Sequence, residues 1–186
     1  MLALVAVALA NADGRTGSFL SRLLGARDDR RVVFAIAVGA FVINATIAAI
    51  AGAIANRMIG QGIIALLVAF ALLSAAVALA WRGRLTLADD RALAAPLPLL
   101  AVRMLLVQFG DRSHFLIGAL AATSGAGHWA AAGGLAGWTI AMLPFLAFGP
   151  ALADRTGAKV VRWAATLILT IWGVRSAMTA FGMLGH

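Results

Sequence analysis

The sequence has no cysteine, and only 12% of its 186 residues are charged. Without cysteine there can be no disulfide, no thiolate ligand for a metal ion and no cysteine nucleophile. With so few charges and 63% hydrophobic residues, the chain has too little polar surface for a soluble globular protein. These shortages indicate a membrane protein.

The charges that are present are mostly basic, with 15 Lys and Arg against 7 Asp and Glu. A nucleic-acid-binding protein would gather its basic residues on one exposed surface together with stacking aromatic side chains. Here the basic residues form short clusters between apolar runs, which is typical of cytoplasmic loops of membrane proteins. We therefore expect no nucleic-acid partner. The sequence also has no phosphate-binding loop, metalloprotease motif or nucleophile elbow, so we expect no enzymatic activity.

The apolar runs are long enough for membrane-spanning helices, which need about 20 residues each. Six runs cover about 1–24, Val32–Ala55, Gly62–Trp81, Pro96–Thr123, Trp129–Leu152 and Val160–Leu184. The sequence thus predicts an all-α membrane protein with six transmembrane helices. Residues 1–81 and 96–186 would hold three spans each, joined by a polar cytoplasmic linker over 82–95.

The basic residues also predict an orientation. Ten lie in the loops after spans one, three and five: Arg22, Arg27, Arg30, Arg31, Arg82, Arg84, Arg91, Arg155, Lys159 and Arg162. The opposite side has only Arg57. Basic loops stay in the cytoplasm, so both termini are expected outside it. The first run ends in Ala-Leu-Ala like a signal-peptide cleavage site, but it lacks the basic residues that precede such a run, so we expect it to be retained as a span.

Two short polar motifs interrupt the first and fourth runs. The first is Asn11–Thr16 (NADGRT), and the second, Gln108–Ser113 (QFGDRS), lies 97 positions later. Charges inside a membrane are costly and usually functional. Because each copy begins a set of three spans, the two sets would insert in opposite directions as inverted-topology repeats. The two motifs would then meet near the middle of the membrane.

These motifs resemble the signature Glu-x-Gly-Asp-(Lys/Arg)-(Thr/Ser), which occurs once in each three-helix repeat of a known family. That family is the cation (Ca²⁺/Mn²⁺)–proton antiporters that include transmembrane protein 165 and its bacterial relatives, within the lysine-exporter superfamily. The resemblance covers essentially the whole chain. It implies that the motif acids bind a divalent cation and exchange it for protons.

The two motifs depart from this signature at defined positions. Asn11 and Gln108 stand where the signature has Glu, and Asp13-Gly14 reverses the Gly-Asp order. Carboxylates are thus reduced to Asp13 and Asp111. Amide oxygens still suit hard cations such as Mn²⁺ and Ca²⁺, but they carry no protons near neutral pH.

The expected ion-binding residues are the polar side chains of the two motifs that carry oxygen. They are Asn11, Asp13, Thr16, Gln108, Asp111 and Ser113, with Asp13, Asp111, Asn11 and Gln108 as metal ligands. Arg15, Arg112 and Arg175 are expected to balance charge, with Arg175 pairing with one of the aspartates. Two aspartates can neutralise a divalent ion only if the arginines are turned away. A structural Asp–Arg salt bridge is the competing interpretation of the acids. The motif glycines fit either a broken helix or tight helix packing.

The function we expect is export of Mn²⁺ or Ca²⁺ in exchange for protons, at a site formed by both motifs at the membrane midplane. The expected surroundings are the lipid bilayer of a bacterial inner membrane, with metal ion and protons as transported species and no separate cofactor. The sequence does not decide whether the protein forms a homo-oligomer. The alternatives are transport of another small cation or amino compound, and a membrane scaffold that does not transport.

Overall fold

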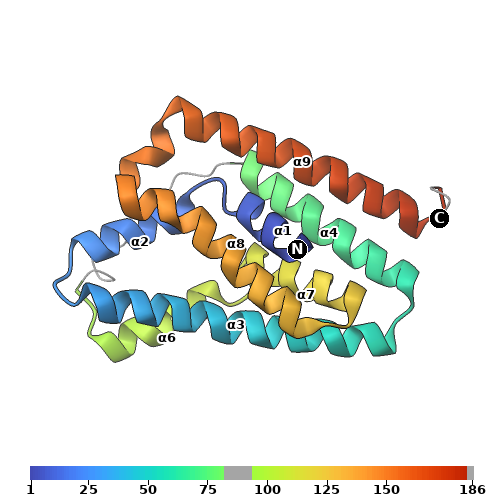
Figure 1. Ribbon diagram of the computed structural model, residues 1–186, viewed down its shortest axis with the longest axis horizontal. Helices are drawn as coiled ribbons and strands as arrows, with labels where there is room; N and C mark the ends of the chain where they lie inside the picture. Colours follow the sequence, from blue (N-terminus) through green and yellow to red (C-terminus); the bar gives the residue numbers. More distant parts are fainter. Residues whose placement is uncertain (82–93, 184–186) are drawn as a thin grey trace.

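A computed structural model describes residues 1–81 and 94–183, and this part of the chain is helical without any β-strand (Figure 1). The predicted linker over 82–95 falls almost entirely outside the described residues. The α-helices are α1 (Leu2–Ala10), α2 (Arg15–Gly25), α3 (Arg30–Met58), α4 (Gln61–Ala80), α6 (Leu97–Gln108), α7 (Arg112–Ser124), α8 (Gly127–Phe148) and α9 (Thr156–Ala180), with a 3₁₀ helix, η1 (Pro150–Asp154), before α9.

Four helices are long and apolar enough to cross a membrane: α3, α4, α8 and α9, with 29, 20, 22 and 25 residues. At a rise of about 1.5 Å per residue, even the shortest spans the roughly 30 Å hydrocarbon core. Their outer faces are also apolar. On α3 an exposed stripe is formed by Ile43, Ile47, Ile50 and Ile54. Such a stripe suits lipid contact better than contact with water, so the apolar helices indicate a membrane-embedded protein.

The first and fourth predicted spans are not continuous helices. A break separates α1 from α2 at residues 11–14, and another separates α6 from α7 at residues 109–111. Both breaks contain a turn at matching positions, since the Gly14 amide donates to the Asn11 carbonyl and the Asp111 amide donates to the Gln108 carbonyl, each at 3.1 Å. Gly14 and Gly110 adopt φ values of +70° and +75°, which glycine reaches without steric cost. Gly14 and Gly110 therefore allow the backbone conformation that interrupts the helix at each break.

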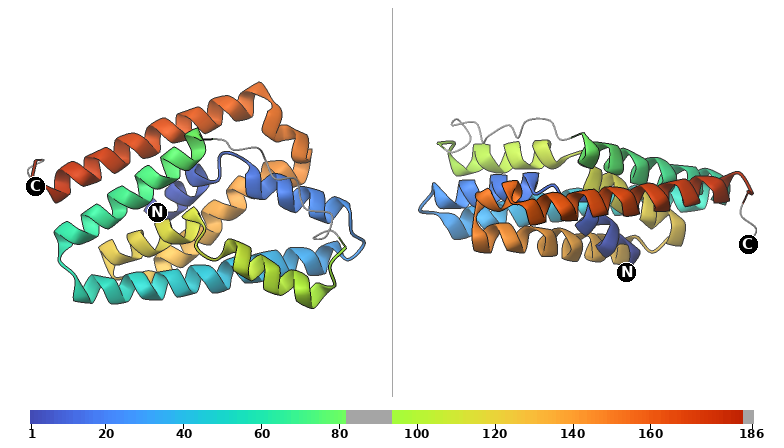
Figure 2. Two further views of the ribbon diagram at one scale, coloured as in Figure 1. Left: turned by 180° about the vertical axis from the view of Figure 1, so that it is seen from behind. Right: turned by 90° about the horizontal axis from the view of Figure 1, so that it is seen from above.

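The helices around the two breaks pack in matching combinations. α3 packs against α6 and α7, while α8 packs against α1 and α2 (Figures 1 and 2). α4 and α9 lie along one another at one edge of the bundle. The short α1 lies inside the bundle and contacts α4, α7, α8 and α9. The first break is thereby buried among the helices, whereas Phe109 and Gly110 of the second break are exposed.

Close helix packing depends on two glycines. Gly52 of α3 lies against the main-chain oxygen of Gly118 in α7, and Gly137 of α8 lies against the main-chain oxygen of Leu4 in α1. A Cβ atom at either glycine would overlap those oxygens. Small residues at crossings let helix backbones approach closely in membrane bundles. These two crossings fix α7 and α1, and therefore both motifs, within the bundle.

Arg27 joins the loop after α2 to the segment before α6. Its Nε and Nη2 atoms donate to the two carboxylate oxygens of Asp29 at 2.8 and 2.9 Å, and Nη1 donates to the Ala95 carbonyl at 2.7 Å. A bidentate guanidinium–carboxylate pair has a defined geometry as well as charge attraction. It holds the α2–α3 loop beside the start of α6.

This pair predicts a pH dependence that is confined to the α2–α3 loop. The hydrogen bonds from Arg27 lower the pKa of Asp29. Their stabilisation is therefore present above the ordinary carboxyl pKa of about 4 and is lost as the pH falls through the lowered value. We expect amide exchange in this loop to be slower in the wild type than in Asp29→Asn at neutral pH. The two proteins should converge in acid, and a pH-independent ratio of exchange rates would contradict the prediction.

Candidate functional site

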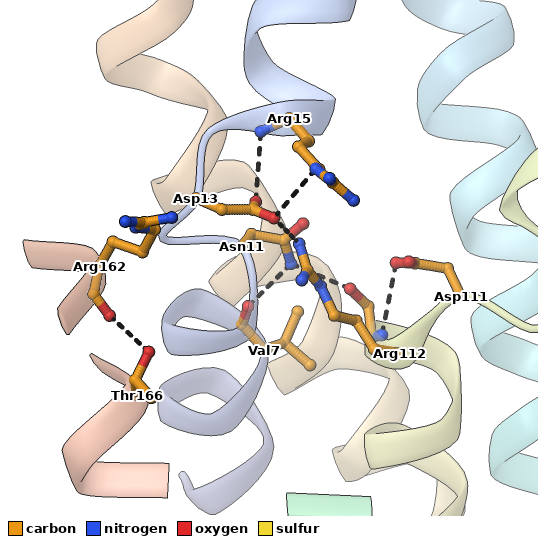
Figure 3. A network of polar contacts seen from close by, with 9 residues as sticks. Val7, Asn11, Asp13, Arg15, Asp111, Arg112, Arg162 and Thr166 are labelled. Atoms are coloured by element: carbon orange, nitrogen blue, oxygen red, sulfur yellow. Dashed lines mark hydrogen bonds and ion pairs between the residues drawn. The ribbon is translucent and has the colours of Figure 1, made fainter. Parts of the chain in front are cut away.

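The two broken helices meet at a buried contact between an amide and a hydroxyl. The Asn11 Nδ2 atom donates to the Ser113 Oγ atom at 2.9 Å and to the Val7 carbonyl at 2.8 Å (Figure 3). Asn11 and Ser113 are 2% and 0% exposed. The last turn of α1 thus holds the asparagine in place, and the asparagine joins the first motif to the start of α7.

A second contact between the motifs is an ion pair. The Nη2 atom of Arg112 lies 2.5 Å from Oδ2 of Asp13, whose side chain is 2% exposed. Arg15 contributes from the same motif as the acid, with its main-chain N–H 3.2 Å from Oδ1 and its Nε atom 3.8 Å from Oδ2. Asp13 therefore lies between two guanidinium groups (Figure 3).

The other aspartate has a different environment. Asp111 caps the N-terminus of α7, where it accepts a hydrogen bond of 3.4 Å from the Ser113 main-chain N–H. It is half-buried and forms no ion pair within residues 1–81 and 94–183. The nearby Gln108 has a buried Oε1 atom without a hydrogen-bond partner among the described residues. Within the described residues, the second motif thus presents a carboxylate without an ion pair and an amide oxygen without a hydrogen bond.

Two predicted site residues lie apart from these contacts. Thr16 is half-buried in the first turn of α2, and its hydroxyl makes no hydrogen bond with the described residues. Arg175 is exposed on α9 and forms no ion pair in the described part of the chain. The prediction that Arg175 pairs with a motif aspartate is wrong, because α9 turns this side chain outward while Arg112 and Arg15 surround Asp13.

Two residues near the first break were not singled out from the sequence. Arg162 of α9 is drawn in the same view as the first break in Figure 3, and its Nε and Nη1 atoms are buried without a hydrogen-bond partner among the described residues. In the sequence, Arg162 belongs to a cluster of basic residues that indicates a cytoplasmic loop, so it was not predicted to lie in the site. The Phe145 ring of α8 packs onto Gly14 and Gly17. Only Pro144, which precedes this ring inside the helix, marks that position in the sequence.

Asn44 and His114 make contacts that join α3 to the helices on either side of the second break. Asn44 of α3 donates to the Leu105 carbonyl of α6 at 3.0 Å, which joins these two helices just before the second break. The His114 ring lies 4.7 Å from the Phe41 ring, between centroids, and its Nε2 atom is 3.4 Å from the Phe41 carbonyl. Both side chains hold α3 against the second motif.

The charges of the two motifs cancel formally, because Asp13 and Asp111 are equal in number to Arg15 and Arg112. The described residues contain no group of three or more His, Asp or Glu side chains that could hold a metal ion. The expected coordination by both aspartates therefore requires Arg112 to leave Asp13. In the present arrangement Asp111 alone presents a carboxylate without a cationic partner in the described part of the chain.

Comparisons of the chain with models of protein families, with curated proteins and with solved structures find no match.

Proposed function

We propose that this chain is a secondary transporter that exchanges a small cation for protons across a membrane. The observation that carries this proposal is the meeting of two polar helix breaks, equivalent in position and joined through the buried Asp13, in a protein of long apolar helices. Broken helices that meet in this way are a recurring device for ion and substrate sites in transporters. The resemblance of the motifs to the cation–proton antiporter signature supports the same conclusion.

The architecture we propose is six membrane crossings in two inverted repeats. The α1–α2 and α6–α7 pairs would each make one crossing, and the four long helices would make the others. Three observations support this arrangement: the spacing of 97 residues between the motifs, the equivalent turns in the breaks, and the exchanged packing partners of α3 and α8. The asymmetry of basic loops favours termini outside the cytoplasm of a bacterial inner membrane.

The resemblance implies Mn²⁺ or Ca²⁺ as the transported ion. Asp111, Gln108 and main-chain carbonyls near the second break offer the oxygen ligands that these hard cations prefer. Protons would compete with the cation for the same carboxylates, which couples the two fluxes. In this proposal Asp111 binds the cation or a proton, and Asp13 becomes available to a cation when its arginine partner moves away.

A second candidate substrate is a singly charged cation or a small amino compound. The Arg112–Asp13 ion pair favours it, because this pair leaves one carboxylate rather than two for the substrate. A single positive charge is enough to pair with the Asp111 carboxylate, whereas a divalent ion would keep an excess positive charge beside it. Transport assays with both classes of ion separate the two candidates.

Asp111→Asn provides the direct test of transport. Asparagine retains the N-cap of α7 but removes the carboxylate, so we expect cation flux driven by a pH gradient to fall to background in proteoliposomes. Parallel assays would use Mn²⁺, Ca²⁺, K⁺ and a primary amine. Asp29→Asn is the matched control, since it makes the same change in a loop outside the helices and should leave the flux unchanged.

The outcomes of this assay separate transport from a scaffold. Flux in the wild type that persists at the same rate in Asp111→Asn would refute the proposed site. Wild-type protein that moves none of these ions would favour the membrane scaffold, which differs from the transporter only in lacking flux.

A further inference from the structure

Of the two amide–hydroxyl hydrogen bonds that the paired motifs could form, only one is present among the described residues. Asn11 bonds to Ser113. A shift of 97 residues exchanges the motifs and converts this pair into Gln108 and Thr16. That equivalent contact is absent from the described residues, where the Gln108 Oε1 atom is buried without a hydrogen-bond partner. The amide of the second motif thus lacks the contact that the amide of the first motif has.

The ion pairs show the same asymmetry. Arg112 of the second motif crosses to Asp13 of the first. The two aspartates are 98 positions apart, one more than the shift that relates the other motif residues, and the corresponding crossing would take Arg15 of the first motif to Asp111 of the second. In this structure Arg15 instead lies beside Asp13, and Asp111 has no ion pair within the described part of the chain (Figure 3). One aspartate is therefore surrounded by guanidinium groups and the other is not.

Two repeats that fold alike can exchange conformations, and inverted-repeat transporters change access by moving one repeat against the other. An asymmetric arrangement of two similar motifs therefore has a counterpart in which their contacts are reversed. The chain carries every side chain that the reversed contacts need. Both arrangements pair an amide with a hydroxyl and a guanidinium with a carboxylate. The two states therefore have contacts of similar kind, and their free energies can be close.

We infer that the centre binds one cation at a time at alternating half-sites, and that arginine exchange opens them in turn. In this structure the open half-site is Asp111 with Gln108, while Arg112 acts as a tethered cation that closes Asp13 with Asn11. In the other state Arg15 pairs with Asp111, Gln108 bonds to Thr16, and Asp13 with Asn11 becomes the open half-site. The inference rests on the proposed transport function and gives each arginine a defined place in its cycle.

A tethered cation solves an electrostatic problem of the empty carrier. An isolated carboxylate in a low-dielectric interior is costly unless a positive charge neutralises it. A guanidinium can take the place of the transported cation on one aspartate while the cargo occupies the other. The cargo is thereby required at only one carboxylate in each state, which agrees with the absence of a cluster of three or more acidic or histidine side chains in the described residues.

Cysteine cross-linking tests the exchange directly, since the chain has no cysteine of its own. One variant carries Asn11→Cys and Ser113→Cys, and the other carries Thr16→Cys and Gln108→Cys. Each would be treated in liposomes with a short bifunctional thiol reagent, and the joined peptides would be identified by mass spectrometry. We expect cross-links in both variants, with the second increased several-fold when Arg112→Gln is added.

The outcomes distinguish the exchange from transport itself. Cross-linking of the first pair without any cross-linking of the second, with and without Arg112→Gln, would overturn the exchange even if cations are transported. Cross-links in both variants together with absent flux would support the exchange and refute the transport function.

Labelling of the native aspartates provides a second measurement that needs no cysteines. A hydrophobic carbodiimide modifies protonated carboxyl groups, and its adducts at Asp13 and Asp111 can be counted by mass spectrometry. Arg15→Gln removes the partner that Asp111 needs in the alternative state, so we expect labelling of Asp13 to fall several-fold. In a rigid centre the same change would remove a neighbouring charge from Asp13 and increase its labelling, and that increase would overturn the inference. Arg112→Gln is the positive control, since it should expose Asp13 to the reagent.

Discussion

Replacement of Asp13 by asparagine is expected to destabilise the folded protein by about 3–5 kcal/mol, the usual cost of breaking a buried ion pair. Asp13 is 2% exposed on its side chain and lies 2.5 Å from Arg112, whose side chain is only 13% exposed. The asparagine would leave that guanidinium without its counter-charge in the interior. Unfolding in mixed detergent micelles containing increasing SDS, followed by tryptophan fluorescence, would measure the loss.

Asp111→Asn is the matched control for this prediction. Asp111 forms no ion pair in the described part of the chain, and asparagine is an equally good N-cap, so the loss should stay below about 1 kcal/mol. The double variant Asp13→Asn/Arg112→Gln should recover part of the stability, because it removes both charges together. Equal losses for Asp13→Asn and Asp111→Asn would contradict the asymmetry of the centre.

Replacement of Gly52 by alanine is expected to destabilise the bundle by about 1–3 kcal/mol through overpacking. The added Cβ atom would overlap the main-chain oxygen of Gly118, and a main-chain atom cannot turn aside as a flexible side chain does. α3 and α7 would have to separate, which would also move the second motif that begins α7. The same SDS titration would measure the effect.

Gly39 provides a control within the same helix. A Cβ atom at Gly39 would meet nothing within 4 Å, so Gly39→Ala should stabilise α3 by up to about 1 kcal/mol through helix propensity. The two substitutions are chemically identical and should have opposite signs. A stabilising effect of Gly52→Ala would show that α3 and α7 do not cross closely at this point.

The long helices could be predicted from the sequence because apolar runs of membrane length have few alternatives to a helix. The runs near Val32–Ala55 and Gly62–Trp81 correspond to α3 and α4, and the last two runs correspond to α8 and α9. The motif glycines allowed either broken helices or tight packing, and the structure has breaks at both. The division into repeats and the number of membrane crossings remain predictions.

The pairing of the charges could not be predicted, because it depends on side-chain directions at a contact between residues about 100 positions apart. Arg15 and Arg112 are equivalent in the sequence, and nothing in their neighbours indicates that Arg112 takes Asp13. The same reason explains the error at Arg175. A basic residue deep in an apolar run was expected to face inward, but the helix turns it outward.

The formal neutrality of the four charged side chains in the centre has an electrical consequence. Moving one elementary charge across a potential of 100 mV involves about 2.3 kcal/mol. The two aspartates and two arginines together carry no net charge, so reorientation of the empty centre would do no work against the membrane voltage. The voltage would then act on the cargo alone. In the proposed exchange the carrier is loaded in both directions, with the cation one way and protons the other, so the potential acts only on the difference between the charges carried in the two directions.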